Sequence, residues 1–149
     1  MNVLNVDELQ KLLSSAFPGN EVPVVEELTD DTVVMSQATS SRNSRPGGTL
    51  SGPTMMALAD TAAWMAILAQ VGPALLAVTT SLHIDFLRKP QLDELRARAR
   101  VLKLGRRLCV VDVELFSGNS SDLVAKAQVT YSIPPSYGGV GAASAPGDR

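Results

Sequence analysis

Two hydrophobic spacings divide the chain into helices and strands. Residues 7–17 are predicted to form an amphipathic helix, because their apolar side chains recur every three or four positions. The apolar face consists of Leu9, Leu12, Leu13 and Ala16. Pro18-Gly19 ends this helix. A second, almost entirely apolar helix is expected over residues 53–70, since Pro53 suits a first turn and Gly72-Pro73 follows the pattern.

Six other stretches have the composition and alternation of strands and are bounded by turn residues. They are residues 22–28, 32–38, 78–87, 95–104, 108–116 and 123–133. Thr29-Asp30-Asp31 predicts a hairpin-like turn between the first two, and residues 40–48 form a polar loop before the long helix. In the third stretch, alternation puts Thr80 on the face of Leu82 and Ile84, and Thr79 on the opposite face.

The order of these elements predicts an α+β hotdog fold, in which an antiparallel sheet of about six strands wraps around a long central helix. Short links make the last strands antiparallel neighbours, and a helix so apolar on all sides has to be buried. We divide the chain into an N-terminal helix (1–20), a hotdog domain (21–134) and a disordered tail (135–149). A lone hotdog leaves a sheet edge and part of the helix uncovered, so a homodimer or a dimer of dimers is expected.

Composition excludes several classes of function. The net charge of −2 shows no basic excess for nucleic acid. The single cysteine, Cys109, excludes an intramolecular disulfide and a cysteine-based zinc site, and its apolar surroundings favour a packed thiol over a nucleophile. The N-terminus lacks the pattern of a signal peptide, and the central helix is judged too short and interrupted to span a bilayer. A cytoplasmic location without membrane contact follows.

Asp60 is the one charged side chain between Pro53 and Ala69. An uncompensated polar group in an apolar setting costs roughly 2–7 kcal/mol, and an ionised one costs more. Asp60 therefore either has a structural partner or an exposed face, or it is functional. With a pKa raised by apolar surroundings, it could act as a general base towards water or as a nucleophile on an acyl carbon.

The start of the long helix is a candidate oxyanion or phosphate cradle. Unpaired N–H groups of the first turn, beginning at Gly52, point into the preceding glycine-rich loop. Asp60 follows Gly52 by eight residues, about 12 Å along a helix axis. One carbonyl carbon cannot easily touch both, whereas Asp60 of a second, antiparallel helix can approach. This spacing implies two identical sites, each shared between subunits.

Other polar residues have less specific signals. Thr61 and Thr80 are candidate hydroxyl helpers, although Thr61 could bond its own helix and Thr80 could simply fill a strand. His83 is the only histidine, so neither a metal site nor a Ser-His-Asp triad is supported. Arg96, Arg98 and Arg100 share a strand face, and Arg106 and Arg107 cluster with Lys103 at the next turn, either solvated or binding substrate phosphates.

The segment Gly48 to Pro53, followed by Leu58-Ala59-Asp60-Thr61-Ala62, resembles the hotdog acyl-CoA thioesterases of the phenylacetyl-CoA and 4-hydroxybenzoyl-CoA type. Their motif is a His-Gly-Gly turn opening the central helix, followed by Leu-Ala-Asp-Thr-Ala. The resemblance extends through residues 80–90 to about Ile133. It implies that Asp60 is the catalytic carboxylate, that Gly52 belongs to the oxyanion turn, and that Thr80 lies near a hydroxyl that positions water in some members.

Ser51 and Pro53 depart from this motif, standing in place of its His and second Gly. Proline lacks an N–H, so the remaining donors are Gly52, Thr54 or the Ser51 hydroxyl. The preferred interpretation is an acyl-CoA thioesterase without a cofactor, with Met56 and Trp64 lining an acyl pocket. The methionines of this helix are equally ordinary as core filler. The alternatives are a hotdog protein that binds acyl-CoA without hydrolysing it and, less supported around His83, a hotdog dehydratase.

Overall fold

The central helix α2 (Gly52–Val71) is the axis of the molecule. The structure is a computed structural model and describes residues 1–135. The helix begins one residue before and ends one residue after its predicted bounds. Most of its side chains from Leu58 to Ala69 are buried. Its N-cap is Ser51, so Gly52 and Pro53 are the first two helical residues.

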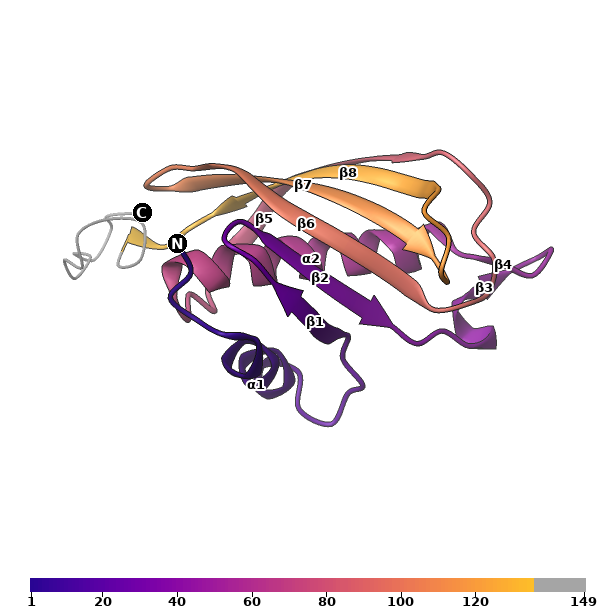
Figure 1. Ribbon diagram of the computed structural model, residues 1–149, viewed down its shortest axis with the longest axis horizontal. Helices are drawn as coiled ribbons and strands as arrows, with labels where there is room; N and C mark the ends of the chain where they lie inside the picture. The colour runs from indigo at the N-terminus through magenta and orange to yellow at the C-terminus, as the bar shows by residue number, and fades with distance from the viewer. Residues whose placement is uncertain (136–149) are drawn as a thin grey trace.

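Six antiparallel strands curve over α2 as one sheet, in the order β1-β2-β6-β7-β8-β5 (Figure 1). Their bounds are β1 (Val24–Leu28), β2 (Thr32–Gln37), β5 (Val78–Phe86), β6 (Leu95–Leu104), β7 (Leu108–Ser117) and β8 (Leu123–Ser132). The inward side chains of the sheet and the buried sides of α2 form one hydrophobic core. The predicted hotdog architecture is thereby confirmed.

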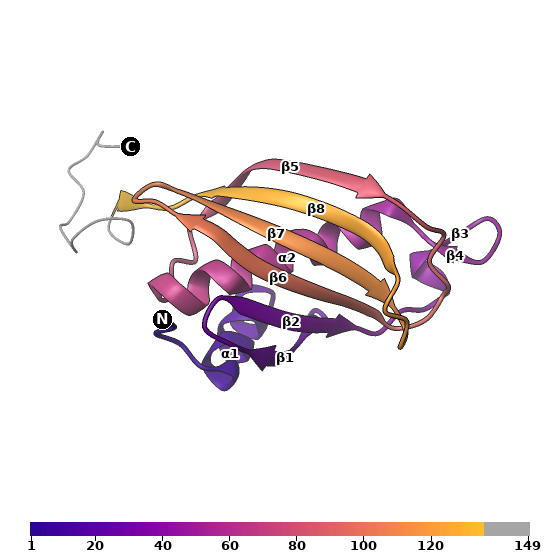
Figure 2. The ribbon, with the colours of Figure 1, turned by 45° about the horizontal axis from the view of Figure 1, so that its top comes forward.

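The position of β5 differs from the prediction. We expected the last four strands to be consecutive neighbours, and this holds for β6, β7 and β8. However, β5 pairs with β8 at one edge of the sheet, while β6 pairs with β2 (Figure 2). The connection over residues 87–94 is longer than a hairpin turn. It runs from β5 at the edge of the sheet to β6, which is not a neighbour of β5.

The polar loop over residues 40–48 has its own structure. A 3-10 helix, η1 (Ser41–Asn43), leads into a small hairpin of β3 (Ser44–Arg45) and β4 (Thr49–Leu50). Gly47 and Gly48 at its tip have positive φ angles of 98° and 73°, a backbone conformation that glycine adopts at little cost. This hairpin brings the chain to the first turn of α2.

The N-terminal helix α1 (Val6–Ala16) covers one end of α2. Leu9 and Leu13 are buried, as the spacing predicted, and Asn5 and Glu8 form a capping box. Phe17, after the helix, packs edge to face against Trp64 with ring centroids 6.2 Å apart. Leu4 reinforces this end through a backbone bond to Ala69 O at 3.2 Å. The C-terminal half of α2 is therefore covered within one protomer.

By length and composition α2 is long enough to cross a membrane, contrary to the prediction, but 61% of its apolar window is buried inside the fold, the pattern of a core helix.

The predicted tail lies, from residue 136, outside the described residues. Cys109 is fully buried and burial raises its thiol pKa to about 11, in agreement with a packed thiol.

Candidate active site

The first turn of α2 has one free backbone donor. Ser51 Oγ accepts a hydrogen bond from the Thr54 N–H at 3.3 Å and lies 2.8 Å from Thr54 Oγ1. Pro53 has no N–H. Among residues 1–135, no acceptor contacts the Gly52 N–H. Of the donors considered from the sequence, Thr54 N–H is thus occupied by the cap, and Gly52 N–H is available to a ligand oxygen.

Asn43, which sequence reasoning missed, connects this turn to the preceding loop by hydrogen bonds. Its backbone carbonyl accepts the Ser51 N–H at 2.7 Å, and its Nδ2 donates to Thr54 Oγ1 at 3.4 Å. Its Oδ1 accepts the Ser40 N–H, which orients the amide. The polar character of the loop was visible in the sequence, but nothing local singled out Asn43.

A hollow of about 650 Å³ opens beside the Gly52 end of the helix. Gly52, Met55 and Phe86 line its apolar side. A Cβ added at Gly52 would lie 3.4 Å from Phe86 Cζ, so the absence of a side chain keeps this approach open. The cations Arg45, Arg88 and Lys89 also line the hollow. Its size falls within the range of small-molecule sites.

Asp60 is half-buried on α2, with one oxygen held by two hydroxyl groups. Thr79 Oγ1 donates to Asp60 Oδ1 at 2.7 Å, and Tyr131 Oη donates to the same oxygen at 2.8 Å. Tyr131 Oη also lies 3.1 Å from the backbone carbonyl oxygen of Asp60. The carboxylate is therefore not an isolated charge in apolar surroundings. Its Oδ2 has no hydrogen-bond partner among residues 1–135 and is open to a substrate or water.

Thr79, not Thr80, is the threonine on Asp60. The pairing of β5 with β8 shifts by one residue between Thr79 and Ser81, and this bulge turns Thr79 towards the helix. Thr80 Oγ1 instead donates to the carbonyl of Thr130 at 3.2 Å. Strict alternation, which would put Thr80 on the face of Leu82 and Ile84, does not hold at a bulge, and sequence reasoning missed both Thr79 and Tyr131.

The face of α2 that carries Asp60 is uncovered in its N-terminal half. Pro53 and Ala57 are exposed, and Met56 is 40% exposed, so Met56 lies at the surface of the protomer. Trp64, one turn beyond Asp60, is covered by Phe17. Thr61 is half-buried and follows Asp60 directly, a spacing at which two helical side chains do not face each other.

Arg106 and Arg107 lie at the opposite end of the protomer from Gly52. They form the β6–β7 turn, next to the row in which Leu108, Ser132 and Val78 are aligned. Gly52 instead lies against Phe86, at the other end of β5. In one protomer these two arginines and the helix start are not brought together, and the cations at the hollow are Arg45, Arg88 and Lys89.

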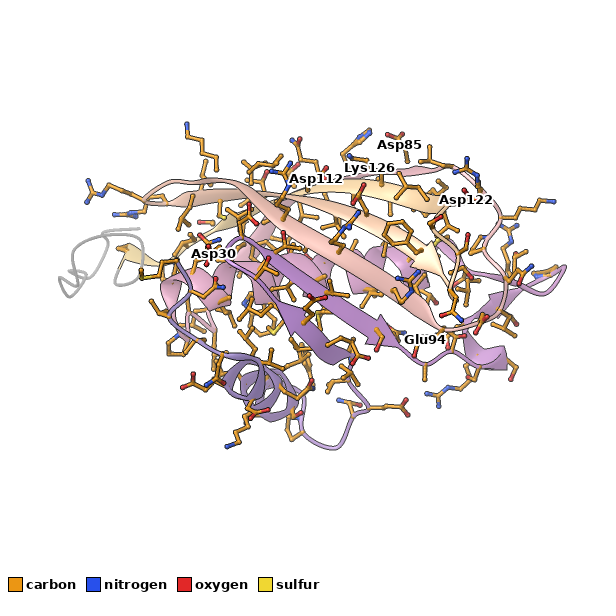
Figure 3. All side chains as sticks on the ribbon, viewed as in Figure 1. Asp30, Asp85, Glu94, Asp112, Asp122 and Lys126 are labelled. Atoms are coloured by element: carbon orange, nitrogen blue, oxygen red, sulfur yellow. The ribbon has the colours of Figure 1, made fainter. Side chains whose placement is uncertain are left out.

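The opposite face of the sheet is a charged surface. His83 and Asp85 pair at 3.1 Å, and Lys126 pairs with Asp112 at 3.4 Å. Asp85, Lys126 and Asp112 all lie on the side of the sheet away from α2 (Figure 3). His83 thus faces away from Asp60. Among residues 1–135, no group of three His, Cys, Asp or Glu side chains is close enough to hold a metal ion.

Gly52 and Asp60 are separated along the central helix. Because α2 is a continuous helix, they are about 12 Å apart along its axis. Gly52 lines the hollow, whereas the Asp60 carboxylate is held by Thr79 of β5 and Tyr131 of β8. Among residues 1–135, the two groups are therefore not in contact with each other.

Comparison with known proteins shows the family to which the chain belongs. The family model of the thioesterase superfamily matches residues 47–130, which include Gly52, Asp60 and Thr79. No curated protein sequence matches the chain.

Solved structures agree with the family match. A candidate thioesterase from a Silicibacter species is 40% identical with a TM-score of 0.80, covering 91% of this chain and 95% of its own. A conserved protein of Pseudomonas aeruginosa is 31% identical with a TM-score of 0.66, covering 75% and 86%. Zebrafish thioesterase superfamily member 2, at 21% identity and a TM-score of 0.77 over 88% and 99%, shares the fold. The chain belongs to the thioesterase superfamily of hotdog proteins.

Proposed function

We propose that the protein is an acyl-CoA thioesterase in which Asp60 acts on the thioester carbonyl. The observation that carries this proposal is the state of the Asp60 carboxylate: two hydroxyl donors fix Oδ1, and Oδ2 is left open on an uncovered helix face. A carboxylate with a purely structural role would be expected to have both oxygens satisfied. The family match supports thioester hydrolysis in general.

Hydrolysis requires a nucleophile, a place for the oxyanion and a departing thiolate. Oδ2 of Asp60 either removes a proton from water, which then attacks the acyl carbon, or attacks that carbon itself to form an anhydride that water hydrolyses. The carbonyl oxygen becomes negative as the new bond forms, and the Gly52 N–H at the helix N-terminus stabilises it. In both routes the tetrahedral adduct then expels the thiolate by breaking the C–S bond, which in the second route gives the anhydride. The thiolate takes up a proton.

A second copy of the chain completes this site in our proposal. The 12 Å between Gly52 and Asp60 prevents one protomer from presenting both to one carbonyl. The uncovered part of α2 lies beside the free edge of β5, where Val78, Phe86 and Leu87 are about half exposed. Pairing of two β5 edges with antiparallel α2 helices would cover this surface and bring each Asp60 towards the Gly52 of the other copy.

The cations beside Gly52 support coenzyme A as the leaving group. Coenzyme A carries phosphates at the end of a long apolar and amide arm, and Arg45, Arg88 and Lys89 line the same hollow as Gly52 and Phe86. A thioester carbonyl at the Gly52 N–H would let that arm pass through the hollow, with its phosphates among the cations. In this proposal these residues replace Arg106 and Arg107 as the phosphate contacts within the protomer.

A second candidate function is binding of acyl-CoA without hydrolysis. The observation that favours it is the count of donors in the first turn, where Pro53 has no N–H and the cap occupies that of Thr54. One backbone N–H is a minimal oxyanion site. The hydrolase is preferred because binding alone gives no reason for the held carboxylate of Asp60.

The test is a panel of aromatic and aliphatic acyl-CoAs, with released CoA measured by a thiol reagent, for the wild type and for Asp60→Asn. Asparagine keeps a carbonyl acceptor for Thr79 and Tyr131 and replaces Oδ2 with a group that neither takes a proton nor attacks carbon. We expect kcat to fall by about 10²-fold or more while the fold is retained. Near wild-type turnover by Asp60→Asn would refute the mechanism. Tight acyl-CoA binding without release of CoA by the wild type would establish the binder.

A further inference from the structure

Tyr131 occupies an unusual place for a core aromatic residue. It lies on the inward face of β8 and is only 4% exposed. Its hydroxyl reaches two atoms of Asp60: the carboxylate Oδ1 at 2.8 Å and the backbone carbonyl oxygen at 3.1 Å. A phenylalanine would fill nearly the same space. The hydroxyl is therefore the part of the side chain that needs an explanation.

The phenol is held in its protonated form. Burial, and to a lesser extent the nearby charge of Asp60, raise the pKa of Tyr131 well above its usual range. The hydroxyl thus remains a hydrogen-bond donor throughout the pH range in which an aspartate titrates. Since a carboxylate oxygen accepts what a phenol donates, Tyr131 stays a donor to Asp60 Oδ1 over that range.

Two donors on one oxygen make the carboxylate asymmetric. Thr79 reaches Oδ1 at 2.7 Å from the edge strand β5, and Tyr131 reaches it from β8. With both accepting positions of Oδ1 engaged, rotation about the Cβ–Cγ bond would break both hydrogen bonds. The contact of Tyr131 with the Asp60 carbonyl also ties this arrangement to the helix backbone.

We propose that Tyr131 is a positioning residue, which together with Thr79 holds Oδ1 of Asp60 so that Oδ2 is the reactive oxygen. This inference rests on the proposed function of Asp60. In a shared site, the distance from Oδ2 to the acyl carbon depends on the torsion angles of one short side chain. A misplacement of about 1 Å can cost 10²-fold in rate. Tyr131 removes that freedom from inside the core, where the partner subunit has no access.

Other charged groups on the surrounding elements face elsewhere. On β5, His83 and Asp85 pair with each other, and on β8, Lys126 pairs with Asp112. All four lie on the sheet face away from α2. Asp60 is the only charged residue of α2. Within residues 1–135, Tyr131 is thus the titratable side chain in direct contact with Asp60.

The test compares Tyr131→Phe with the wild type in two independent measurements. The first is the pKa of Asp60, followed by NMR of its isotope-labelled carboxyl carbon and assigned by loss of the signal in Asp60→Asn. Removal of one hydrogen-bond donor to Oδ1 should raise this pKa measurably. This measurement needs no turnover, so it tests the contact even if the proposed function fails. An unchanged pKa would overturn the inference.

The second measurement is the pH profile of hydrolysis. Because the ionised carboxylate is the active form, the acid limb of kcat/KM should move to higher pH by the same amount in Tyr131→Phe. On the plateau, kcat should fall about tenfold while KM stays within about twofold. In an Asp60→Asn background, Tyr131→Phe should have no further effect on residual turnover. An equal loss in both backgrounds would mean that Tyr131 supports only the fold, and would overturn the inference.

A fluorotyrosine at position 131 keeps the test decisive if Tyr131→Phe does not fold. Fluorination retains the shape of the ring and makes the phenol a stronger donor. The pKa of Asp60 should then fall and the acid limb should move to lower pH. If fluorination leaves both unchanged, the inference is wrong.

Discussion

Exchange of the first two residues of α2 tests whether Gly52 supplies the oxyanion donor. In Gly52→Pro/Pro53→Gly, the proline moves from the second to the first helical position. The N–H at position 52 is lost and one appears at position 53, while the number of prolines and glycines in the turn is unchanged. Ser51 has φ −75° and ψ 151°, the extended conformation that a residue before proline requires. Proline is also favoured at the first position of a helix.

The expected magnitude follows from the count of donors. Thr54 N–H is occupied by Ser51 Oγ, so Gly52 has the one free N–H in this turn. Loss of one oxyanion donor costs about 2.7–4 kcal/mol, or 10²–10³-fold in kcat. The exchanged variant should lose activity on this scale. Its unfolding free energy should change by no more than about 1 kcal/mol, the cost of a glycine inside a helix.

The single variant Pro53→Gly is the matched control. It keeps the N–H at position 52 and adds one at position 53, so kcat should stay within about threefold if Gly52 already serves the oxyanion. The assay is release of CoA from the acyl-CoA that the wild type hydrolyses fastest, with thermal unfolding measured on the same samples. If the exchanged variant retains wild-type kcat, Gly52 is not the donor. If Pro53→Gly instead gains tenfold or more, Gly52 alone is an incomplete oxyanion site. A wild type without measurable hydrolysis of any acyl-CoA, whose Pro53→Gly variant gains activity, would favour the binder.

Three further predictions address the other parts of the site. A mixture of Asp60→Asn and the exchanged variant should recover about a quarter of wild-type activity. Half of the dimers are then mixed, and each mixed dimer contains one intact shared site out of two. No recovery in verified mixed dimers would place the whole site in one protomer. Thr79→Val should lower kcat about tenfold. Thr80→Val loses only a hydrogen bond to a backbone carbonyl, so its kcat should stay within about twofold of the wild type. The reverse order of the two kcat values in steady-state kinetics would mean that Thr80 is the hydroxyl that assists Asp60. The double variant Arg45→Gln/Lys89→Gln should raise KM for an acyl-CoA about tenfold and leave KM for the corresponding acyl-pantetheine unchanged. The double variant Arg106→Gln/Arg107→Gln should change neither KM. The opposite pattern would mean that the β6–β7 turn binds the phosphates.

The sequence alone determined the parts of this protein that depend on local periodicity. The apolar run from Pro53 to Ala69 had to be a buried helix, and alternation with turn residues located all six strands of the main sheet to within two residues at each end. The isolated charge of Asp60 and the glycine before Pro53 could be found for the same reason: each departs from the pattern of its neighbours.

The tertiary structure decided everything that depends on contacts between distant segments. The strand β5 lies at the edge of the sheet because residues 87–94 cross to β6. The bulge after Thr79 puts Thr79, and not Thr80, in contact with Asp60. Tyr131 reaches Asp60 across 71 residues of sequence, and its tyrosine hydroxyl has no local signature. The occupied N–H of Thr54 depends on the rotamer of Ser51. Local propensity constrains an element and its faces, but which polar atoms meet is fixed only when the elements pack.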